Sequence, residues 1–178
     1  MRIGVLALQG GFRPHLQALI EIGFDPIEVR SASALSSIEG LVLCGGESTA
    51  QMKLIERLGM QDPLLRAFSS VPVFATCAGL ILLSRFGVLD VEVERNAYGP
   101  QIYSFEATSD RGRPLVFIRA PKIKKLGRSV EVLDTLEGEP ILVRQASFTA
   151  ATFHPELTDD RSLHAAIFAE RQSARPVL

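Results

Sequence analysis

Residues 71–83, Val-Pro-Val-Phe-Ala-Thr-Cys-Ala-Gly-Leu-Ile-Leu-Leu, run from one apolar stretch through small residues into a second apolar stretch. This order is typical of a buried strand that turns sharply into a helix. Cys77 stands at the turn, and Ala75, Ala78 and Gly79 are small enough for a tightly folded backbone there. The segment therefore predicts a strand-turn-helix unit that raises one cysteine side chain above the edge of a sheet.

The chain before this unit repeats the same alternation of apolar runs with stretches of helical spacing. Short, partly β-branched runs favour central parallel strands, and the stretches between them favour crossover helices. Strands are expected at residues 3–8, 26–29, 40–43 and 71–75, and helices at residues 16–22, 49–58 and 62–68. Gly23 is expected to end the first helix. The first half thus predicts an α/β, flavodoxin-like arrangement with a mostly parallel sheet.

The second half of the chain has a different sequence pattern. From Arg85 to Val143, short strand-like runs such as Ile102-Tyr103 and Phe105 are separated by Gly, Pro and charged turns. These strands either extend the sheet or form a small antiparallel layer beside it. Residues 161–171 predict a last amphipathic helix that packs on the sheet. Because no low-complexity linker interrupts the 178 residues, we expect one domain over residues 1–178.

Composition excludes several classes of protein. Hydrophobic residues make up 47% of the chain, which predicts a folded core rather than a disordered chain. Lys and Arg number 19 against 20 Asp and Glu, so no charge footprint for nucleic acid or an anionic membrane is present. No apolar run approaches the roughly 20 residues that cross a bilayer. We expect a cytoplasmic protein in which Cys44 and Cys77 are free thiols.

Cys77 is the candidate nucleophile. The helix that begins after it aims unpaired backbone N–H groups and a partial positive charge at the thiol, which favours the thiolate and can hold an oxyanion. The alternative is a small buried hydrophobe, the role of most free cysteines. Cys44 ends an apolar strand and precedes Gly45-Gly46 without a helix start immediately after it, so we expect it to be structural.

The candidate base is His154, in Phe-His-Pro-Glu. In an extended backbone His154 and Glu156 lie on the same side, and Pro155 favours that backbone at His154. Glu156 would then fix the imidazole tautomer and leave the other ring nitrogen to accept the thiol proton. The alternative is a surface turn without chemistry. His15 and His164 lie on expected helices, where we predict solvated or capping roles.

A glycine-rich loop follows the strand at residues 40–43. Gly45 and Gly46 allow a substrate to approach the backbone closely, at the edge where open α/β sheets bind ligands. The loop lacks the Gly-Lys-Ser/Thr of a phosphate-binding loop, and Glu47 would repel a phosphate. Ser48 or Thr49 is expected to cap the next helix. The backbone N–H groups of Gly46 and Ala78 are the candidate oxyanion donors.

The motifs together resemble one family, the glutaminase subunits of pyridoxal 5'-phosphate synthase, which are class I (triad) glutamine amidotransferases. The resemblance covers nearly the whole chain, and its motifs occur in order. They are Gly4-Val-Leu-Ala-Leu-Gln-Gly, Gly45-Gly-Glu-Ser-Thr, Thr76-Cys-Ala-Gly-Leu-Ile, Val93-Glu-Arg-Asn-Ala-Tyr-Gly, Ser104-Phe-Glu, Val116-Phe-Ile-Arg-Ala-Pro and Thr152-Phe-His-Pro-Glu-Leu-Thr.

The resemblance implies roles for single residues. It makes Cys77 the nucleophile, His154 the base and acid, and Glu156 the orienting residue, in agreement with the interpretation from the residues alone. It also implies a glutamine pocket formed by Gly46, Glu47, Ser48, Arg95, Ile118 and Arg119. An arginine and an acidic residue can select the α-carboxylate and α-ammonium of an amino acid. Gln9 resembles the residue that links this site to the partner synthase.

The implied reaction is attack of the Cys77 thiolate on the side-chain amide of L-glutamine, release of ammonia and hydrolysis of a glutamyl thioester, without a metal or cofactor. The ammonia would pass to a (β/α)-barrel synthase subunit in a large hetero-oligomer. Two alternatives stay open. One is a glutaminase for another synthase, such as that of imidazole glycerol phosphate. The other is a flavodoxin-like thiol sensor, in which Cys77 is reactive but glutamine is not turned over.

Overall fold

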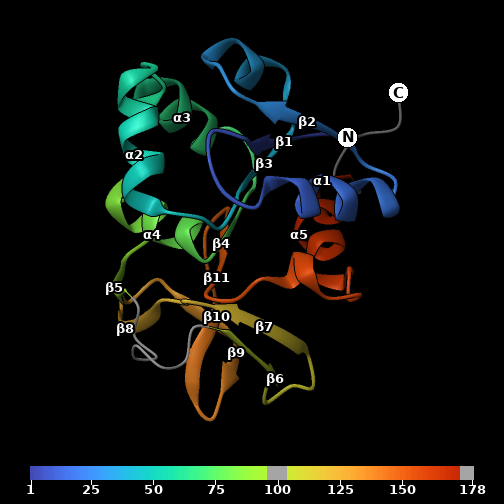
Figure 1. Cartoon of the computed structure of the whole chain (residues 1–178), viewed down its shortest axis with the longest axis vertical. Helices are drawn as coiled ribbons and strands as arrows, with labels where there is room; N and C mark the ends of the chain where they lie inside the picture. Colours follow the sequence, from blue (N-terminus) through green and yellow to red (C-terminus); the bar gives the residue numbers. More distant parts are fainter. Residues whose placement is uncertain (96–103, 173–178) are drawn as a thin grey trace.

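The computed structural model describes residues 1–95 and 104–172 of the chain. Its central element is a seven-stranded sheet with the strand order β2-β1-β3-β4-β11-β10-β9 (Figure 1). The strands are β1 (Arg2–Leu6), β2 (Asp25–Val29), β3 (Gly40–Leu43), β4 (Val73–Thr76), β9 (Glu131–Leu136), β10 (Glu139–Gln145) and β11 (Phe148–Ala151). The first four and β11 pair in parallel, whereas β9 and β10 pair antiparallel. The expected α/β fold class is therefore confirmed.

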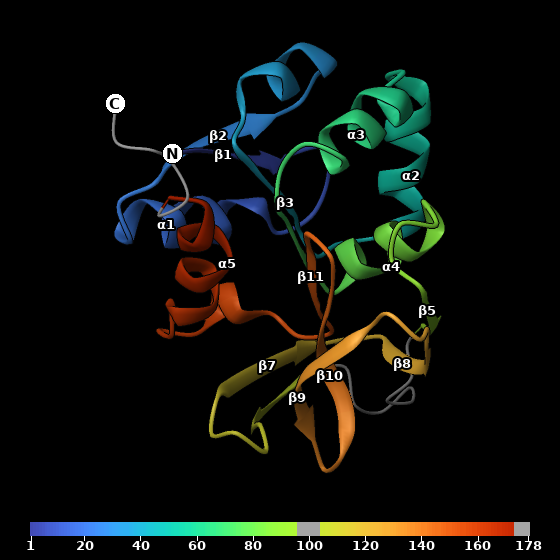
Figure 2. The ribbon, with the colours of Figure 1, turned by 180° about the vertical axis from the view of Figure 1, so that it is seen from behind.

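Helices cover both faces of this sheet. They are α1 (Phe12–Glu21), α2 (Ser48–Arg57), α3 (Gln61–Phe68), α4 (Ala78–Arg85) and α5 (Ser162–Gln172), with short 3₁₀ turns η1 (Ala32–Ser37) and η2 (Pro155–Leu157). Helices α1 and α5 lie on one face, and α2, α3 and α4 lie on the other (Figures 1 and 2). In the described part of the chain, no helix is long and apolar enough to span a membrane.

Both faces of the central strands are buried, as the apolar runs of the sequence predict. Successive side chains of a strand point to opposite faces. Leu41 and Leu43 of β3 pack in the core under α2, α3 and α4, whereas Val42 packs with Leu19 of α1 and Phe168 of α5. Burying apolar surface on each face stabilises this layered arrangement by about 25 cal/mol for each Å² removed from water.

The helix expected at residues 16–22 begins four residues earlier than the apolar spacing indicated. Pro14 lies in its first turn, where a missing N–H costs no helical hydrogen bond. The predicted end is confirmed: Gly23 has a φ of 83°, and the N–H of Phe24 donates to the carbonyl of Leu19. His15 lies within α1, on a helix as expected.

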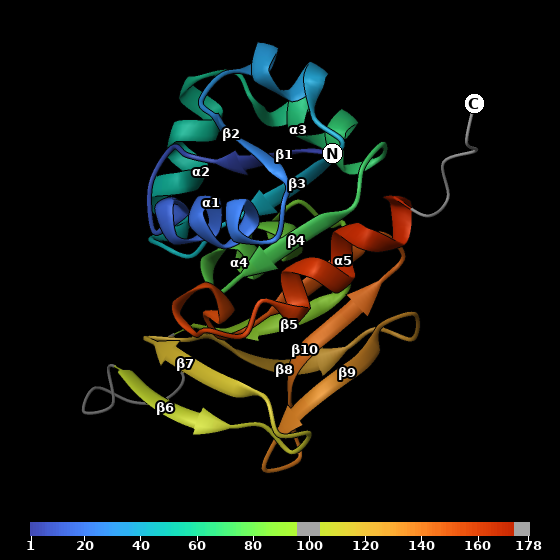
Figure 3. The ribbon, with the colours of Figure 1, turned by 90° about the vertical axis from the view of Figure 1, so that its right-hand side faces the viewer.

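Both arrangements left open for the second half occur. Strands β9, β10 and β11 extend the central sheet. Strand β5 (Val91–Glu94) pairs with β8 (Lys122–Leu126), and β6 (Ser104–Thr108) pairs with β7 (Pro114–Ile118), as two small antiparallel sheets (Figure 3). The strand expected at Ile102-Tyr103, and residues 96–99 of the Val-Glu-Arg-Asn motif, lie outside the described residues.

Candidate active site

Cys77 lies at a strained turn between β4 and α4. Its backbone has φ 49° and ψ −105°, a conformation that costs a residue other than glycine of the order of 1–3 kcal/mol. The Cys77 N–H donates to the carbonyl of Ala151 in the neighbouring strand at 2.8 Å, which holds the turn. A Cβ on Gly79 would lie 2.1 Å from the carbonyl oxygen of Leu43, so this position needs glycine. The predicted strand-turn-helix unit is present.

A pocket of about 220 Å³ opens above this turn. Its size suits a small molecule. Ten residues that the sequence analysis placed in the site line it: Cys77, Ala78, His154, Glu156, Gly46, Glu47, Ser48, Arg95, Ile118 and Arg119. Pro14 of α1 and Leu157 of η2 also line it, and no local sequence signal indicates this. Gln9 does not line the pocket.

His154 and Glu156 form a buried hydrogen-bonded pair. His154 Nδ1 lies 2.7 Å from Glu156 Oε1, and the His154 N–H donates to the carbonyl of Val116 in β7 at 2.8 Å. The imidazole also interacts with the Cys77 thiol. The extended backbone expected for residues 154–156 is wrong, because Pro155 starts the 3₁₀ turn η2. The turn, rather than strand alternation, brings the carboxylate back to the ring.

The two side chains shift each other's protonation. Burial acts to lower the pKa of His154, but hydrogen bonds with Cys77 and Glu156 outweigh it and raise the pKa to about 10. Burial acts to raise the pKa of Glu156, but interactions with His15 and His154 hold it well below its ordinary value. At neutral pH Glu156 is a carboxylate and His154 readily holds a proton. A proton passed from the Cys77 thiol to His154 is therefore kept on the ring until a leaving group takes it.

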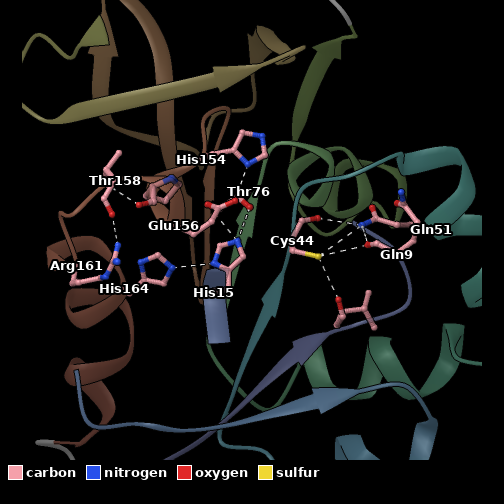
Figure 4. Close-up of polar contacts among 12 residues, drawn as sticks. Gln9, His15, Cys44, Gln51, Thr76, His154, Glu156, Thr158, Arg161 and His164 are labelled. Carbon is pink, nitrogen blue, oxygen red and sulfur yellow. Dashed lines mark hydrogen bonds and ion pairs between the residues drawn. The ribbon is translucent and has the colours of Figure 1, made fainter. Parts of the chain in front are cut away.

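His15 and His164 are not solvated, so the roles predicted for them are wrong. Both side chains are fully buried, and His15 Nδ1 lies 3.0 Å from His164 Nε2. His15 Nε2 lies 3.1 Å from Thr76 Oγ1 and 3.4 Å from Glu156 Oε2 (Figure 4). Helical spacing carried a signal for this burial. Ala18 and Leu19 follow His15 at i+3 and i+4 on one buried face of α1.

The glycine-rich loop approaches the imidazole closely. A Cβ on Gly45 would lie 2.3 Å from His154 Cε1 and 3.4 Å from Cys77 Cβ. Gly46 has a φ of 152°, in the region that favours glycine. The loop therefore needs glycine at position 45 to pass beside the histidine, and at position 46 because of its φ and its close approach to Gly10. The oxyanion role of Gly46 and Ala78 stays a prediction.

The expected helix cap at Ser48 or Thr49 is wrong. Glu47 is the N-cap of α2, and its Oε1 accepts from the Thr49 N–H at 3.2 Å. The same oxygen accepts from Arg95 Nη2 at 2.8 Å, because the longer glutamate side chain reaches both groups. The bond from Thr49, with the Arg95 charge, lowers the pKa of Glu47. The hydroxyl of Ser48 is buried, lines the pocket and has no hydrogen-bond partner in the described part of the chain.

Gln9 lies behind the loop. Its Oε1 accepts from the Glu47 N–H at 2.9 Å, and its backbone carbonyl accepts from Gln51 Nε2 at 2.9 Å. Gln51 Nε2 also donates to the carbonyl of Cys44 at 3.2 Å. Gln9 and Gln51 thus tie the loop after β1 to the loop after β3. Cys44 is buried here, and burial raises the pKa of its thiol to about 12, so it is unreactive at neutral pH.

His164 makes the fold sensitive to acid. Burial is the main cause that lowers its pKa from 6.5 to about 3. The unfolded chain therefore takes up a proton at His164 first, and stability is lost as the pH falls from 6.5 toward 3. Between pH 6.5 and 4.5 we expect the free energy of unfolding to fall by about 2 kcal/mol from this residue. Urea denaturation at several pH values measures the loss.

The variant His164→Leu isolates this contribution. It removes the titrating ring but keeps an apolar side chain in the core between α1 and α5. We expect the free energy of unfolding of this variant to be nearly constant over the same pH range. The lowered pKa of Glu156 changes the stability only at lower pH, where the unfolded chain begins to protonate this carboxylate. Parallel pH profiles for the two proteins would contradict the assignment.

Comparison with known proteins identifies the family. The model of the SNO glutamine amidotransferase family matches residues 5–173. The chain is 45% identical to the pyridoxal 5'-phosphate synthase subunit PdxT of Kosmotoga olearia, over 92% of this chain and 94% of the relative. It is also 45% identical to PdxT of Shouchella clausii, over 100% of this chain and 98% of that relative. A crystal structure of a glutamine amidotransferase superposes with a TM-score of 0.88 at 43% identity, over 94% of this chain and 97% of that one. The chain that forms this pocket belongs to the SNO glutamine amidotransferase family.

Proposed function

We propose that the protein hydrolyses L-glutamine to L-glutamate and ammonia and delivers the ammonia to a synthase subunit that forms pyridoxal 5'-phosphate. The observation that carries the proposal is the meeting of Cys77, His154 and Glu156 in one pocket at the carboxyl edge of the sheet. Relatives that match nearly the whole chain are subunits of pyridoxal 5'-phosphate synthase. These relatives favour this synthase over that of imidazole glycerol phosphate.

The first half of the reaction forms a thioester. His154 takes the thiol proton, and the sulfur of Cys77 attacks the side-chain amide carbon of glutamine. The carbonyl oxygen becomes an oxyanion, for which the N–H groups of Gly46 and Ala78 are the donors. His154 then gives its proton to the amide nitrogen, the C–N bond breaks, and ammonia leaves. The pKa of about 10 suits His154 to the donor step.

The second half of the reaction restores the enzyme. His154 takes a proton from water, and the hydroxide formed attacks the thioester carbon. The C–S bond breaks, the sulfur recovers the proton through His154, and glutamate leaves. Glu156 holds the ring orientation through Nδ1 in both halves. Every group in this scheme belongs to the chain, the substrate or water.

The charges at the pocket rim suit a free amino acid. Glu47 is the partner for the α-ammonium, and Arg95 and Arg119 are the candidates for the α-carboxylate. Glu47 Oε1 and Arg95 Nη2 lie 2.8 Å apart as an ion pair. Glutamine carries both charges, so it can replace each partner of this exposed ion pair. Ser48 and Ile118 complete the glutamine contacts that we propose.

The partner subunit completes the system. We propose that the whole chain forms one glutaminase domain and works in the cytoplasm. Its partner is a (β/α)-barrel synthase subunit, which it binds within a large hetero-oligomer. We propose that Gln9 couples the two subunits, and the hydrogen bond that its Oε1 accepts from the Glu47 N–H supports this role. A shift of Gln9 on docking would move this loop directly.

The test follows the nitrogen atom. The protein is mixed with the synthase subunit, its sugar phosphates and glutamine labelled with ¹⁵N in the side-chain amide. We expect glutamate release, and the label in pyridoxal 5'-phosphate. Glutamate release without label in the product would point to another synthase. A Cys77 that alkylates readily in a protein without glutamine turnover would instead support the thiol-sensor alternative.

Gly45→Ala is expected to disable the site without unfolding the protein. The new Cβ would lie 2.3 Å from His154 Cε1, so the ring has to move from its position beside Cys77. A misplacement near 1 Å costs about a hundredfold in rate, and we expect kcat to fall by that amount. Glutamate release with the synthase measures it.

Gly11→Ala is the matched control. A Cβ at Gly11 meets no atom within 4 Å, although this residue lies at the same pocket. We expect its kcat to stay close to that of the wild type, with the same melting temperature. Equal activity of the Gly45 and Gly11 variants would contradict the steric argument.

A further inference from the structure

The polar network of the site continues behind Glu156. His15 comes from α1, Thr76 from β4 and His164 from α5, and all three side chains are buried. Figure 4 shows the side chains from His154 through Glu156 to His15 and His164 pointing toward one another. His15 lines no part of the pocket, so it has no direct contact with a substrate there.

We infer that His15 is a positioning residue for glutamine hydrolysis: its Nε2–H holds the second carboxylate oxygen of Glu156, so that the first oxygen stays on His154. The inference rests on the proposed function of the triad. It assigns to α1 a role in the reaction, although no residue of the helix belongs to the triad.

The carboxylate of Glu156 has one firm hydrogen bond. Its Oε1 lies 2.7 Å from His154 Nδ1. Its Oε2 is buried and makes no well-aligned hydrogen bond within the described residues. The terminal torsion of a glutamate is broad, so one hydrogen bond leaves the carboxylate free to rotate. The contact of Oε2 with His15 Nε2 at 3.4 Å limits that rotation and compensates the buried charge.

His15 also links Glu156 to the strand of the nucleophile. The same Nε2 lies 3.1 Å from Thr76 Oγ1, and Thr76 directly precedes Cys77. One ring edge therefore contacts both η2, which carries Glu156, and the end of β4. This contact fixes the distance between the two parts of the site.

His164 sets the tautomer of His15. The lowered pKa of His164, about 3, keeps it neutral at neutral pH. A neutral His164 can donate its Nε2–H to His15 Nδ1 at 3.0 Å, which leaves the proton of His15 on Nε2, toward Glu156. His164 Nδ1 is then an acceptor without a partner, in agreement with its lack of a hydrogen bond in the described part of the chain.

Two substitutions of His15 separate its two ring nitrogens. The amide nitrogen of a glutamine side chain reaches as far as histidine Nε2, whereas that of asparagine reaches only as far as Nδ1. His15→Gln therefore keeps a donor toward Glu156, and His15→Asn loses it. Both variants remove the ring, so the comparison holds the loss of packing nearly constant.

We expect kcat of His15→Asn to fall about tenfold to hundredfold, the effect of losing a polar contact with a buried charged group, with KM unchanged. His15→Gln should stay within about threefold of the wild type. Proton NMR adds a direct readout, because the Nδ1–H of His154 gives a low-field signal while it is held by Glu156. This signal should persist in the glutamine variant and broaden or shift in the asparagine variant.

Two outcomes would overturn the inference. One is an equal loss of kcat in both variants, which would assign packing alone to His15. The other is an unchanged His154 signal and unchanged kcat in His15→Asn. Wild-type protein that releases no glutamate with its synthase would instead refute the proposed function, and the NMR comparison would still decide the position of Glu156. Melting temperatures identify any variant that fails to fold.

Discussion

Cys77→Ala abolishes glutamine hydrolysis, with an expected loss in kcat of about 10⁴-fold or more, the scale seen when a covalent nucleophile is removed. Alanine offers no sulfur for the thioester, and water does not replace it because His154 is oriented toward the side chain at position 77. Alanine also fits the turn, which is already lined by small residues. Glutamate release in the presence of the synthase measures the loss.

Cys44→Ala is the matched control for the same chemical change. Cys44 is buried behind the loop, its Sγ donates to the carbonyl of Leu6 at 3.4 Å, and it does not line the pocket. We expect a modest loss of stability, about 1 kcal/mol, and nearly unchanged kcat. A thiol-alkylating reagent should inactivate the wild type and the Cys44 variant alike. Normal turnover in Cys77→Ala would remove this residue from the mechanism.

Glu156→Gln is expected to lower kcat about 10³- to 10⁴-fold, as replacement of the orienting acid does in other triads. The amide is nearly the same size, so the fold is retained, but it lacks the negative charge that stabilises the imidazolium. KM should change little, because the carboxylate acts through the ring. The pKa of His154 should fall below its value of about 10, since one of its two raising interactions is weakened. Kinetics and an NMR titration of His154 measure both effects.

Glu21→Gln serves as the control for the loss of a glutamate. Glu21 pairs with Arg161 on the surface, between α1 and α5, and has no contact with the pocket. Such exposed pairs contribute little to stability, so activity and fold should be unchanged. Equal kinetics of Glu156→Gln and the wild type would refute the orienting role.

The strand-turn-helix unit that presents Cys77 could be predicted because its signals are local. A β-branched run, small residues around Cys77 and a second apolar run determine the strand-turn-helix unit within thirteen residues. The pairing of His154 with Glu156 was predicted for a similar reason, since only Pro155 separates them. The conformation of the backbone between them was not predicted, because a proline favours both an extended residue before it and a helical turn after it.

The contacts of His15 and His164 could not be predicted from local sequence patterns. Nothing within ten residues of His15 indicates that its partners are Thr76, Glu156 and His164, because these come from three other elements. A histidine on an amphipathic helix is compatible with surface and core alike. Only the packing of α1 and α5 on the same face of the sheet puts the two rings in contact.

The amino-acid pattern alone specifies the class of fold, the turn that presents Cys77 and the pairing of His154 with Glu156, because hydrophobic period, residue size and short spacing act over a few residues. The assembly of the site depends on longer-range contacts. The pairing of β11 beside β4 brings residues 77 and 154 together, the loop at Gly45 passes within van der Waals distance of the imidazole, and His15 closes behind Glu156. These contacts join residues far apart in the chain, and the burial of both faces of one sheet selects them.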